Sequence, residues 1–245
     1  MVRKKHRIIN LVLFFLFLAA AVCGWQLYSD YLKSSTADTA VGEIRDSKPS
    51  IPDEGNAEDR SLMDFGELKA ENPDTIAWLT IPGTEIDYPV MQTIDNEFYL
   101  YHDARKNTNA NGALFLDYRA HSDFSGFTNV IYGHHMASGM MFQNLMEFKE
   151  KAFFDSYRTG ILYTPDVTWQ LEFFATATVP YDSDVYDYTA VSIADKEEYL
   201  DMVADIALHY RDIDVTADDR IVVLSTCSYE YQDAKTVVIG RLVRK

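Results

Sequence analysis

The first pattern along the chain is an uncharged apolar run that follows a basic N-terminus. Residues 1–7 carry four Lys or Arg and no acid, and residues 8–28 contain no charged side chain. A helix of that length, at about 1.5 Å per residue, spans a hydrocarbon core of about 30 Å. Trp25, Tyr28 and Tyr31 follow at the end where interfacial aromatic residues are found.

This pattern predicts a single transmembrane anchor over residues 8–28. Basic flanks stay on the cytoplasmic side, so we expect residues 1–7 to be a cytoplasmic tail and the remainder to be extracellular. The alternative is a cleaved signal peptide, although the apolar run is longer than the usual 7–15 residues. Small residues in "AAAVCG" keep cleavage open. Cys23 is also compatible with a lipoprotein signal, but Ala20 stands where such signals have Leu.

The next segment is polar and has no apolar period. Residues 29–60 are rich in Ser, Pro, Gly and acidic side chains, which is typical of a linker or stalk. From residue 61 the pattern becomes that of a folded domain. We therefore expect an extracellular linker over 29–60 and one folded domain over 61–245, with no internal repeat.

Short β-rich runs dominate the folded part. They are bounded by turn residues and lie at residues 75–83, 85–92, 112–118, 129–135, 160–164, 169–179, 220–227 and 236–243. About eight short strands at such spacing indicate a β-barrel or sandwich. Helical periodicity is confined to three stretches, residues 61–74, 140–156 and 193–212. The last of these is a long helix just before the strand that ends in Cys227.

Composition narrows the functional class. The chain has 245 residues, a formal net charge of -16 and a pI near 4.6. Nucleic-acid phosphates require clustered Lys and Arg, so we expect no nucleic-acid partner. The acidic balance instead predicts a soluble, self-repelling surface on the outer domain.

The candidate chemistry begins with cysteine. The chain has two cysteines, and only Cys227 lies outside the apolar N-terminal run, so an intradomain disulfide is excluded. Cys227 ends a strand, where it is either a small buried hydrophobe or a reactive thiol. A nucleophilic thiolate benefits from a nearby cation and from a histidine. It also needs a donor for the oxyanion of a tetrahedral intermediate.

Two histidines and one lysine fit that requirement. His134 and His135 end the strand "NVIYGHH", and on pattern alone either is a candidate. Lys235 begins the strand after the cysteine loop, whereas Arg241 lies about 20 Å farther along it at about 3.3 Å per residue. A metal site from the two histidines and Cys227 is the weaker hypothesis, because adjacent strand residues point to opposite faces. We expect no metal and no cofactor.

Several stretches together resemble the sortases, specifically class B. They are "FGELKAENPDTIAWLTIPGTEIDYPVMQTIDNEFYL", "GALFLDYR", "NVIYGHHM", "MFQNLMEF" and "LSTCSYEYQDAKTVVIGRLV", which lie between Phe65 and Val243. The resemblance implies an eight-stranded β-barrel with flanking helices. It also implies an N-terminal helical extension and a long helix before the cysteine strand. The family is anchored in the cell membrane of Gram-positive bacteria.

The resemblance also implies an activity. Sortases are cysteine transpeptidases that cleave a C-terminal sorting signal at a Thr–Gly type of bond and pass the acyl group to a peptidoglycan amine. Carried over by position, Cys227 is the nucleophile and His134, directly after Gly, is the general acid/base. Ser225, Thr226 and Tyr229 match substrate-lining positions. Class B relatives recognise motifs of the Asn-Pro-x-Thr or Ser-Pro-x-Thr type, and the recognition loop is expected to include parts of residues 181–191 and the helix that follows.

The chain departs from the family pattern at the third catalytic position. The family has Arg at the start of the last strand, and this chain has Lys235 there. Arg presents a planar fork of donors, whereas Lys is a point cation on a flexible stem. Loss of one oxyanion donor costs about 10²–10³ in rate, so the alternative hypothesis is a catalytically weakened protein that binds sorting signals. A hydrolase of surface peptides is a third, more distant interpretation.

Overall fold

The structure is a computed structural model that describes residues 2–50 and 63–245, without the side chains of residues 2–9, 11 and 12. The predictions for residues 51–62, which cover the end of the linker and the start of the catalytic domain, lie outside the described residues. The chain forms two compact units, residues 1–40 and residues 41–245.

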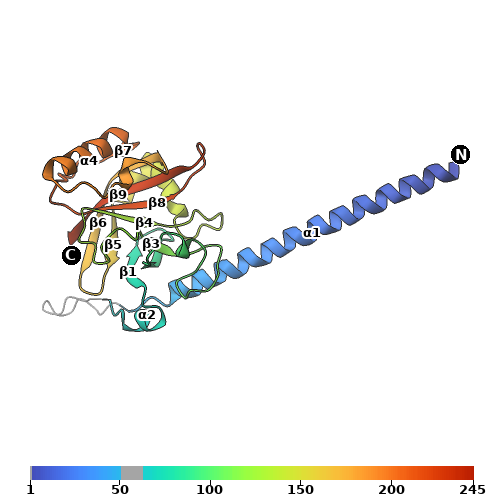
Figure 1. Cartoon of the computed structure of the whole chain (residues 1–245), viewed down its shortest axis with the longest axis horizontal. Helices are drawn as coiled ribbons and strands as arrows, with labels where there is room; N and C mark the ends of the chain where they lie inside the picture. The colour runs from blue at the N-terminus through green and yellow to red at the C-terminus, as the bar shows by residue number, and fades with distance from the viewer. Residues whose placement is uncertain (1, 51–62) are drawn as a thin grey trace. The chain divides into compact units, whose positions relative to one another are not determined.

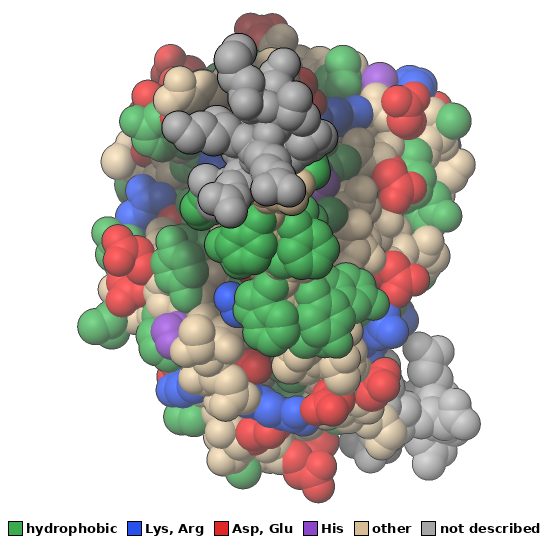
Figure 2. Space-filling view, turned by 90° about the vertical axis from the view of Figure 1, so that its right-hand side faces the viewer, with side chains coloured by type: hydrophobic (Ala, Val, Ile, Leu, Met, Phe, Trp, Pro, Cys, Tyr) green, Lys and Arg blue, Asp and Glu red, His purple; other side chains and the backbone are tan. Residues whose placement is uncertain are grey.

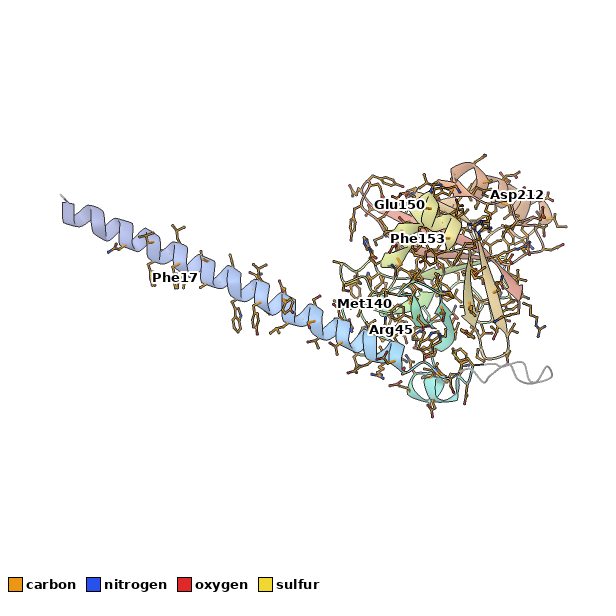
Figure 3. The ribbon with its side chains drawn as sticks, turned by 180° about the vertical axis from the view of Figure 1, so that it is seen from behind. Phe17, Arg45, Met140, Glu150, Phe153 and Asp212 are labelled. Carbon is orange, nitrogen blue, oxygen red and sulfur yellow. The ribbon has the colours of Figure 1, made fainter. Side chains whose placement is uncertain are left out.

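Residues 2–40 of the first unit are helical. They belong to α1 (Val2–Asp46), and the large apolar side chains described between Leu13 and Leu32 are exposed. Phe17, labelled in Figure 3, is 76% exposed. In the part of the chain that the structure describes, this is the one helix long and apolar enough to cross a membrane, judged by length and composition. That agrees with a single N-terminal anchor.

The second unit is built around a closed barrel of eight strands (Figure 1). The strands follow one another around the ring as β5, β1, β2, β3, β4, β8, β9 and β6, and β6 closes the ring on β5. The pairs β2–β3 and β4–β8 are parallel, and the other pairs in the ring are antiparallel. Their bounds are β1 Thr75–Thr80, β2 Asp87–Met91, β3 Leu114–Leu116, β4 Thr128–Tyr132, β5 Thr159–Tyr163, β6 Thr168–Pro180, β8 Ile221–Cys227 and β9 Ala234–Arg244. All eight predicted strands are confirmed, and so is the barrel.

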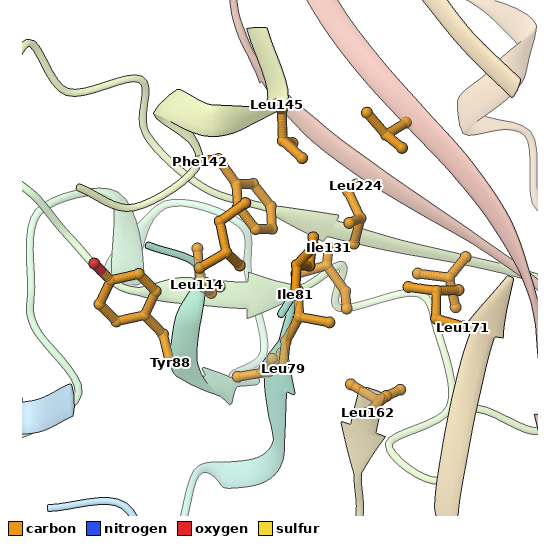
Figure 4. Packing of buried hydrophobic residues seen from close by; sticks show 14 of the residues in the cluster. Leu79, Ile81, Tyr88, Leu114, Ile131, Phe142, Leu145, Leu162, Leu171 and Leu224 are labelled. Carbon is orange, nitrogen blue, oxygen red and sulfur yellow. The ribbon is translucent and has the colours of Figure 1, made fainter. Parts of the chain in front are cut away.

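Side-chain alternation divides the barrel residues between two cores. In β8, Val222 and Leu224 point into the barrel, whereas Ile221 and Val223 pack in a separate cluster on its outer face. Figure 4 shows the interior, where apolar side chains from opposite walls of the barrel meet. The labelled members are Leu79, Ile81, Tyr88, Leu114, Ile131, Phe142, Leu145, Leu162, Leu171 and Leu224.

The outer cluster is covered by α4 (Ile193–Ile206) and the short 3₁₀ helix η3 (Asp184–Tyr186). Ser192 begins α4 as a capping box with Asp195, which satisfies free backbone N–H groups of the first turn. Tyr199 and Val203 bury the inner stripe of this helix against the barrel. The expected long helix before the cysteine strand is therefore confirmed.

Two predicted helices differ from the structure at their ends. The helix expected over 193–212 stops at Ile206, and residues His209–Tyr210 form β7, which pairs with β6. The helix expected over 140–156 is two short pieces, the 3₁₀ helix η2 (Gln143–Lys149) and α3 (Lys151–Ser156). Glu150, labelled in Figure 3, has extended backbone angles and separates them. In both places barrel contacts override the local helical period. The other described helices are α2 (Gly66–Glu71) and the 3₁₀ helix η1 (Phe98–Leu100).

The linker prediction needs correction for its first part. Residues 29–46 are helical, as the C-terminal part of α1, and the second unit includes the chain from Val41 onward. Val41 and Ile44 are buried in core clusters of the second unit. These two apolar side chains are therefore enough to pack the C-terminal end of α1, although the stretch around them is polar. Arg45, labelled in Figure 3, pairs with Glu85.

A carboxylate on β2 secures the segment that follows α1. Asp87 Oδ1 accepts hydrogen bonds from Lys48 Nζ, Thr80 Oγ1 and the indole Nε1 of Trp78, each at 2.7 Å. Trp78 is fully buried, so its N–H has no access to water as a substitute acceptor. On the face shown in Figure 2, acidic and basic side chains are interspersed.

We predict that Asp87→Ala destabilises the folded unit by about 1–3 kcal/mol, because it leaves a buried indole N–H without a partner. Lys48→Met is the matched control: it removes the ion pair and the hydrogen bond from Lys48 to Thr80 but keeps the hydrogen bonds from Trp78 and Thr80 to Asp87, and we expect a loss of about 0–1 kcal/mol. The free energy of unfolding from urea denaturation in detergent measures both. Equal losses for the two variants would contradict this assignment.

Candidate active site

The candidate catalytic residues share one face of the barrel because of strand parity. Cys227 has the parity of Ile221 and Val223, whose side chains lie in the outer cluster. Lys235 has the parity of Val237 and Ile239, which belong to the same cluster. Successive strand residues alternate between faces, so both candidate side chains emerge on the outer face of the barrel.

Cys227 and Lys235 are direct cross-strand partners. They face each other in the antiparallel β8–β9 register, and Lys235 Nζ lies 3.1 Å from Cys227 Sγ as a hydrogen-bond donor. Both residues are half-buried. An ammonium at this distance attracts the negative charge of a thiolate, which is the reactive form of cysteine.

His134 follows the neighbouring strand at the same end. Tyr132 pairs with Ser225 in the parallel β4–β8 register, and Gly133 N donates to Ser225 O at 3.1 Å. His134 and Cys227 each come two residues after that Tyr132–Ser225 pair, on strands about 4.8 Å apart. Parity places His134 on the outer face too, because Val130 lies in the outer cluster.

A backbone carbonyl sets the protonation of His134. The ring Nε2 lies 2.8 Å from the carbonyl oxygen of Leu100, at the end of η1. A carbonyl can only accept, so Nε2 carries a hydrogen and Nδ1 is the nitrogen that can exchange a proton. Gly112 makes room for this ring: it has φ +59, and a Cβ there would come within 2.4 Å of Tyr99 O and 3.1 Å of His134 Cδ2.

The glycine before His134 fixes this strand end against the interior. A Cβ at Gly133 would lie 2.4 Å from Leu114 Cδ2 and 2.7 Å from Phe142 Cδ2. Phe142 N in turn donates to His134 O at 2.9 Å. The histidine backbone is therefore held by a close contact between the strand end and the barrel core.

His135 occupies a different environment. It has the opposite parity, forms an isolated bridge with Met141, and its ring lies 5.4 Å from that of Tyr229. The geometry therefore distinguishes two candidates that the sequence pattern left open, because only His134 has the parity of Cys227. Tyr229 itself is 76% exposed and offers an aromatic surface two residues beyond the thiol.

Ser225 and Thr226, the other expected substrate-lining residues, are each only 2% exposed. Ser225 Oγ hydrogen-bonds Tyr186 OH at 2.9 Å, and Thr226 Oγ1 donates to Gly133 O at 2.8 Å. Their side chains are thus occupied in supporting β4, β8 and η3. Burial raises the pKa of Tyr186 to about 12, so its hydroxyl remains neutral over the physiological range.

A buried carboxylate supports the end of β4 from the other side. Asp117 accepts hydrogen bonds from Tyr132 OH at 3.0 Å and Asn96 Nδ2 at 3.0 Å, and from two nitrogens of Arg119 at 2.8 and 2.9 Å. Burial opposes ionisation of Asp117, but the hydrogen bonds and charge of Arg119 outweigh it and lower its pKa. Tyr132 is thereby fixed just before Gly133 and His134.

The loop between Cys227 and Lys235 is tied to a helix. Glu230 forms an ion pair with Lys149 at the end of η2. This contact lowers the pKa of Glu230 to about 2. His209 Nε2 donates to Lys149 O at 2.7 Å, so the half-buried His209 of β7 also holds the end of η2. Sequence spacing held no signal for these contacts, which join segments far apart in the chain.

The described residues contain no candidate metal-binding site. Among residues 2–50 and 63–245, no group of three or more His, Cys, Asp or Glu side chains is arranged to hold a metal ion. The expectation of a metal-free and cofactor-free enzyme stays a prediction.

A half-buried cysteine beside a cation, with a histidine just beyond the end of the adjacent strand, is the arrangement expected of a cysteine enzyme, and here it lies on a closed β-barrel. Comparison with known proteins gives the family. The family described as "Sortase domain" matches residues 79–243, so the chain belongs to the sortase family.

The relatives are class B sortases. Sortase B of Listeria monocytogenes is 32% identical over 217 residues, covering 88% of this chain and 81% of that protein. The structure of Clostridium perfringens sortase B is 32% identical with a TM-score of 0.70, covering 74% of this chain and all of that one. Sortase B from B. anthracis, 28% identical, superposes with a TM-score of 0.77 over 88% of this chain and all of that one. The class B assignment, the fold and the cysteine transpeptidase activity class are confirmed.

We predict that Lys149→Met raises the pKa of Glu230 from about 2 toward its ordinary value of 4.5, because the ion pair is the largest cause of the lowered pKa; the hydrogen bonds from Ser228 and the backbone remain. Because the folded-state pKa is depressed, this ion pair stabilises the loop fully above about pH 4.5, and the stabilisation is lost as pH falls toward 2. A ¹³C NMR titration of the glutamate carboxyls measures the shift. Lys151→Met, which removes a pair with Asp155, is the control and leaves Glu230 unchanged. An unmoved Glu230 midpoint in Lys149→Met would rule out this contact.

Proposed function

We propose that this protein cleaves a C-terminal sorting signal of secreted proteins at a Thr–Gly type of bond and joins the acyl fragment to a peptidoglycan amine. The observation that carries the proposal is the 3.1 Å contact between Cys227 Sγ and Lys235 Nζ on the face shared with His134. Sortase B of Staphylococcus aureus has been solved as a substrate complex, which supports a sorting-signal substrate here.

Cys227 and His134 carry the two half-reactions. The thiolate attacks the scissile carbonyl carbon, and His134 Nδ1–H protonates the leaving amine, which gives a thioester on Cys227. Neutral His134 then takes a proton from the incoming amine as that amine attacks the thioester. The thiolate leaves and a new amide bond is formed. The Leu100 carbonyl holds Nε2–H throughout, so one nitrogen serves both proton transfers.

Lys235 stabilises the oxyanion in both tetrahedral intermediates. Its ammonium is already placed at the sulfur, next to the atom at which negative charge develops. Tyr229, exposed on the loop, is the candidate contact for the peptide substrate. Lys235 supplies a single cationic nitrogen where the family has a forked guanidinium, so it offers fewer donors to the substrate.

The N-terminal part of α1 anchors the enzyme. We infer a single-pass membrane protein with a cytoplasmic N-terminus and an extracellular catalytic domain, acting at the cell membrane of a Gram-positive bacterium. The exposed apolar helix supports the anchor, and the basic residues of the first seven positions support its orientation.

The test is a search for the thioacyl enzyme. The full chain in detergent is incubated with peptides that carry Asn-Pro-x-Thr and related sorting sequences, and intact mass is recorded for the native chain, Lys235→Arg and Cys227→Ala. We expect an adduct on Cys227 in the native chain and none in Cys227→Ala. An adduct in Lys235→Arg alone would support the weakened, signal-binding alternative. Turnover retained in Cys227→Ala would refute the mechanism.

Adjacent histidines provide a matched comparison. We predict that His134→Ala lowers kcat/KM for peptide cleavage by about 10²–10⁴, as expected for loss of a general acid/base. His135→Ala removes a ring of the same size on the opposite face, and we expect less than about a tenfold loss. Steady-state kinetics with a quenched fluorescent peptide measures both, and circular dichroism confirms folding. A larger loss of kcat/KM in His135→Ala than in His134→Ala would assign the general acid/base to His135 instead.

A further inference from the structure

Lysine differs from arginine in a way that matters after the thioester has formed. A guanidinium stays protonated in proteins, whereas a lysine amine can lose its proton and become a nucleophile. The thioester carbonyl carbon is bonded directly to Cys227 Sγ, the atom that Lys235 Nζ already contacts at 3.1 Å. Productive attack distances are about 3–3.5 Å, so the amine lies within reach of that carbon.

Other contacts do not restrain this amine. Within residues 2–50 and 63–245, Lys235 Nζ has no ion pair, and its hydrogen-bond partner is the sulfur itself. The lysine of the neighbouring helix, Lys149, is engaged by Glu230, and Arg241 on the same strand is engaged by Glu172. Lys235 is therefore the amine placed to meet an acyl group on Cys227.

We propose that Lys235 is an internal acyl acceptor, so that this enzyme acylates itself when an external amine is slow to arrive. The proposal rests on the proposed function, because it needs an acyl group on Cys227. The Lys235 ammonium first releases one proton to solvent. The neutral Nζ then attacks the thioester carbon, the C–S bond breaks, an isopeptide bond to Lys235 forms, and the second proton lost by nitrogen ends on the released thiol. The step needs no further reactant.

The product differs chemically from the thioester. The amide no longer carries the positive charge of Lys235, so the enzyme loses its oxyanion donor while it regains a free Cys227 thiol. The internal transfer thus limits the lifetime of the thioacyl enzyme. External amines have to compete with Lys235 for the acyl group on Cys227. Intramolecular attack has effective concentrations far above those of free amines.

The test installs an acyl group without relying on a sorting motif. The full chain carrying Cys23→Ser, so that Cys227 is the sole thiol, is treated in detergent with phenyl thioacetate and then freed of reagent. Intact mass is followed over time, before and after neutral hydroxylamine, which cleaves thioesters and leaves amides. Iodoacetamide reports whether the Cys227 thiol has been released, and peptide mapping locates the acetyl group.

We expect a hydroxylamine-sensitive adduct on Cys227 that converts to a resistant adduct on Lys235, with release of an alkylatable thiol. In Lys235→Arg the adduct stays sensitive until it hydrolyses, and in Cys227→Ala Lys235 is not acetylated above the level of Lys149. Three results would overturn the proposal: a sensitive adduct that never converts in the native chain, acetylation of Lys235 that is independent of Cys227, or a Cys227 that the reagent does not acylate.

The same experiment separates this proposal from the proposed function. If the probe adduct on Cys227 forms and does not convert, internal transfer fails while thioester chemistry stands. If sorting peptides give no adduct although the probe does, the sorting-signal substrate fails while internal transfer remains measurable with the probe.

Discussion

The position of β8 between β4 and β9 is the constraint on which the site depends. Parallel pairing with β4 fixes where His134 leaves the barrel, and antiparallel pairing with β9 sets Lys235 opposite Cys227. A shift of one residue in either register would turn a side chain of the site to the opposite face. The apolar residues of β8 prevent that shift, because they belong alternately to the inner and outer cores.

Much of this arrangement was predictable from sequence. All eight strand runs were recognisable, since short buried strands bounded by turn residues carry a strong local signal of apolar and β-branched residues. The cysteine, the lysine and the pair of histidines were identified from their positions at strand ends. Side-chain alternation favours His134 over His135 once β4 is known to pair with β8. That pairing is part of the tertiary structure and cannot be read from the local sequence.

Other features had no local signal. The Leu100 carbonyl that orients His134 is a backbone group, and any residue would supply it. The ion pair of Glu230 with Lys149 joins positions 81 apart in the chain. The helical end of α1 was missed because two buried side chains, Val41 and Ile44, are a weak signal within a polar stretch. The helix after residue 193 ends at Ile206 because His209 and Tyr210 pair with β6, and Glu150 takes extended backbone angles between η2 and α3; neither break is marked in the local apolar period.

The close packing of Gly133 couples the rigidity of the interior to that of the site. A Cβ at Gly133 would lie 2.4 Å from Leu114 Cδ2 and 2.7 Å from Phe142 Cδ2, its N–H donates to Ser225 O, and the next residue is His134. A side chain at this position would have to displace these buried side chains or the strand end, so glycine is strongly favoured. A substrate that binds only while His134 is held in place lowers the population of open states of the barrel wall beneath it, and amide hydrogen exchange at Gly133 then reports occupancy of a site that lies on the other face of the sheet.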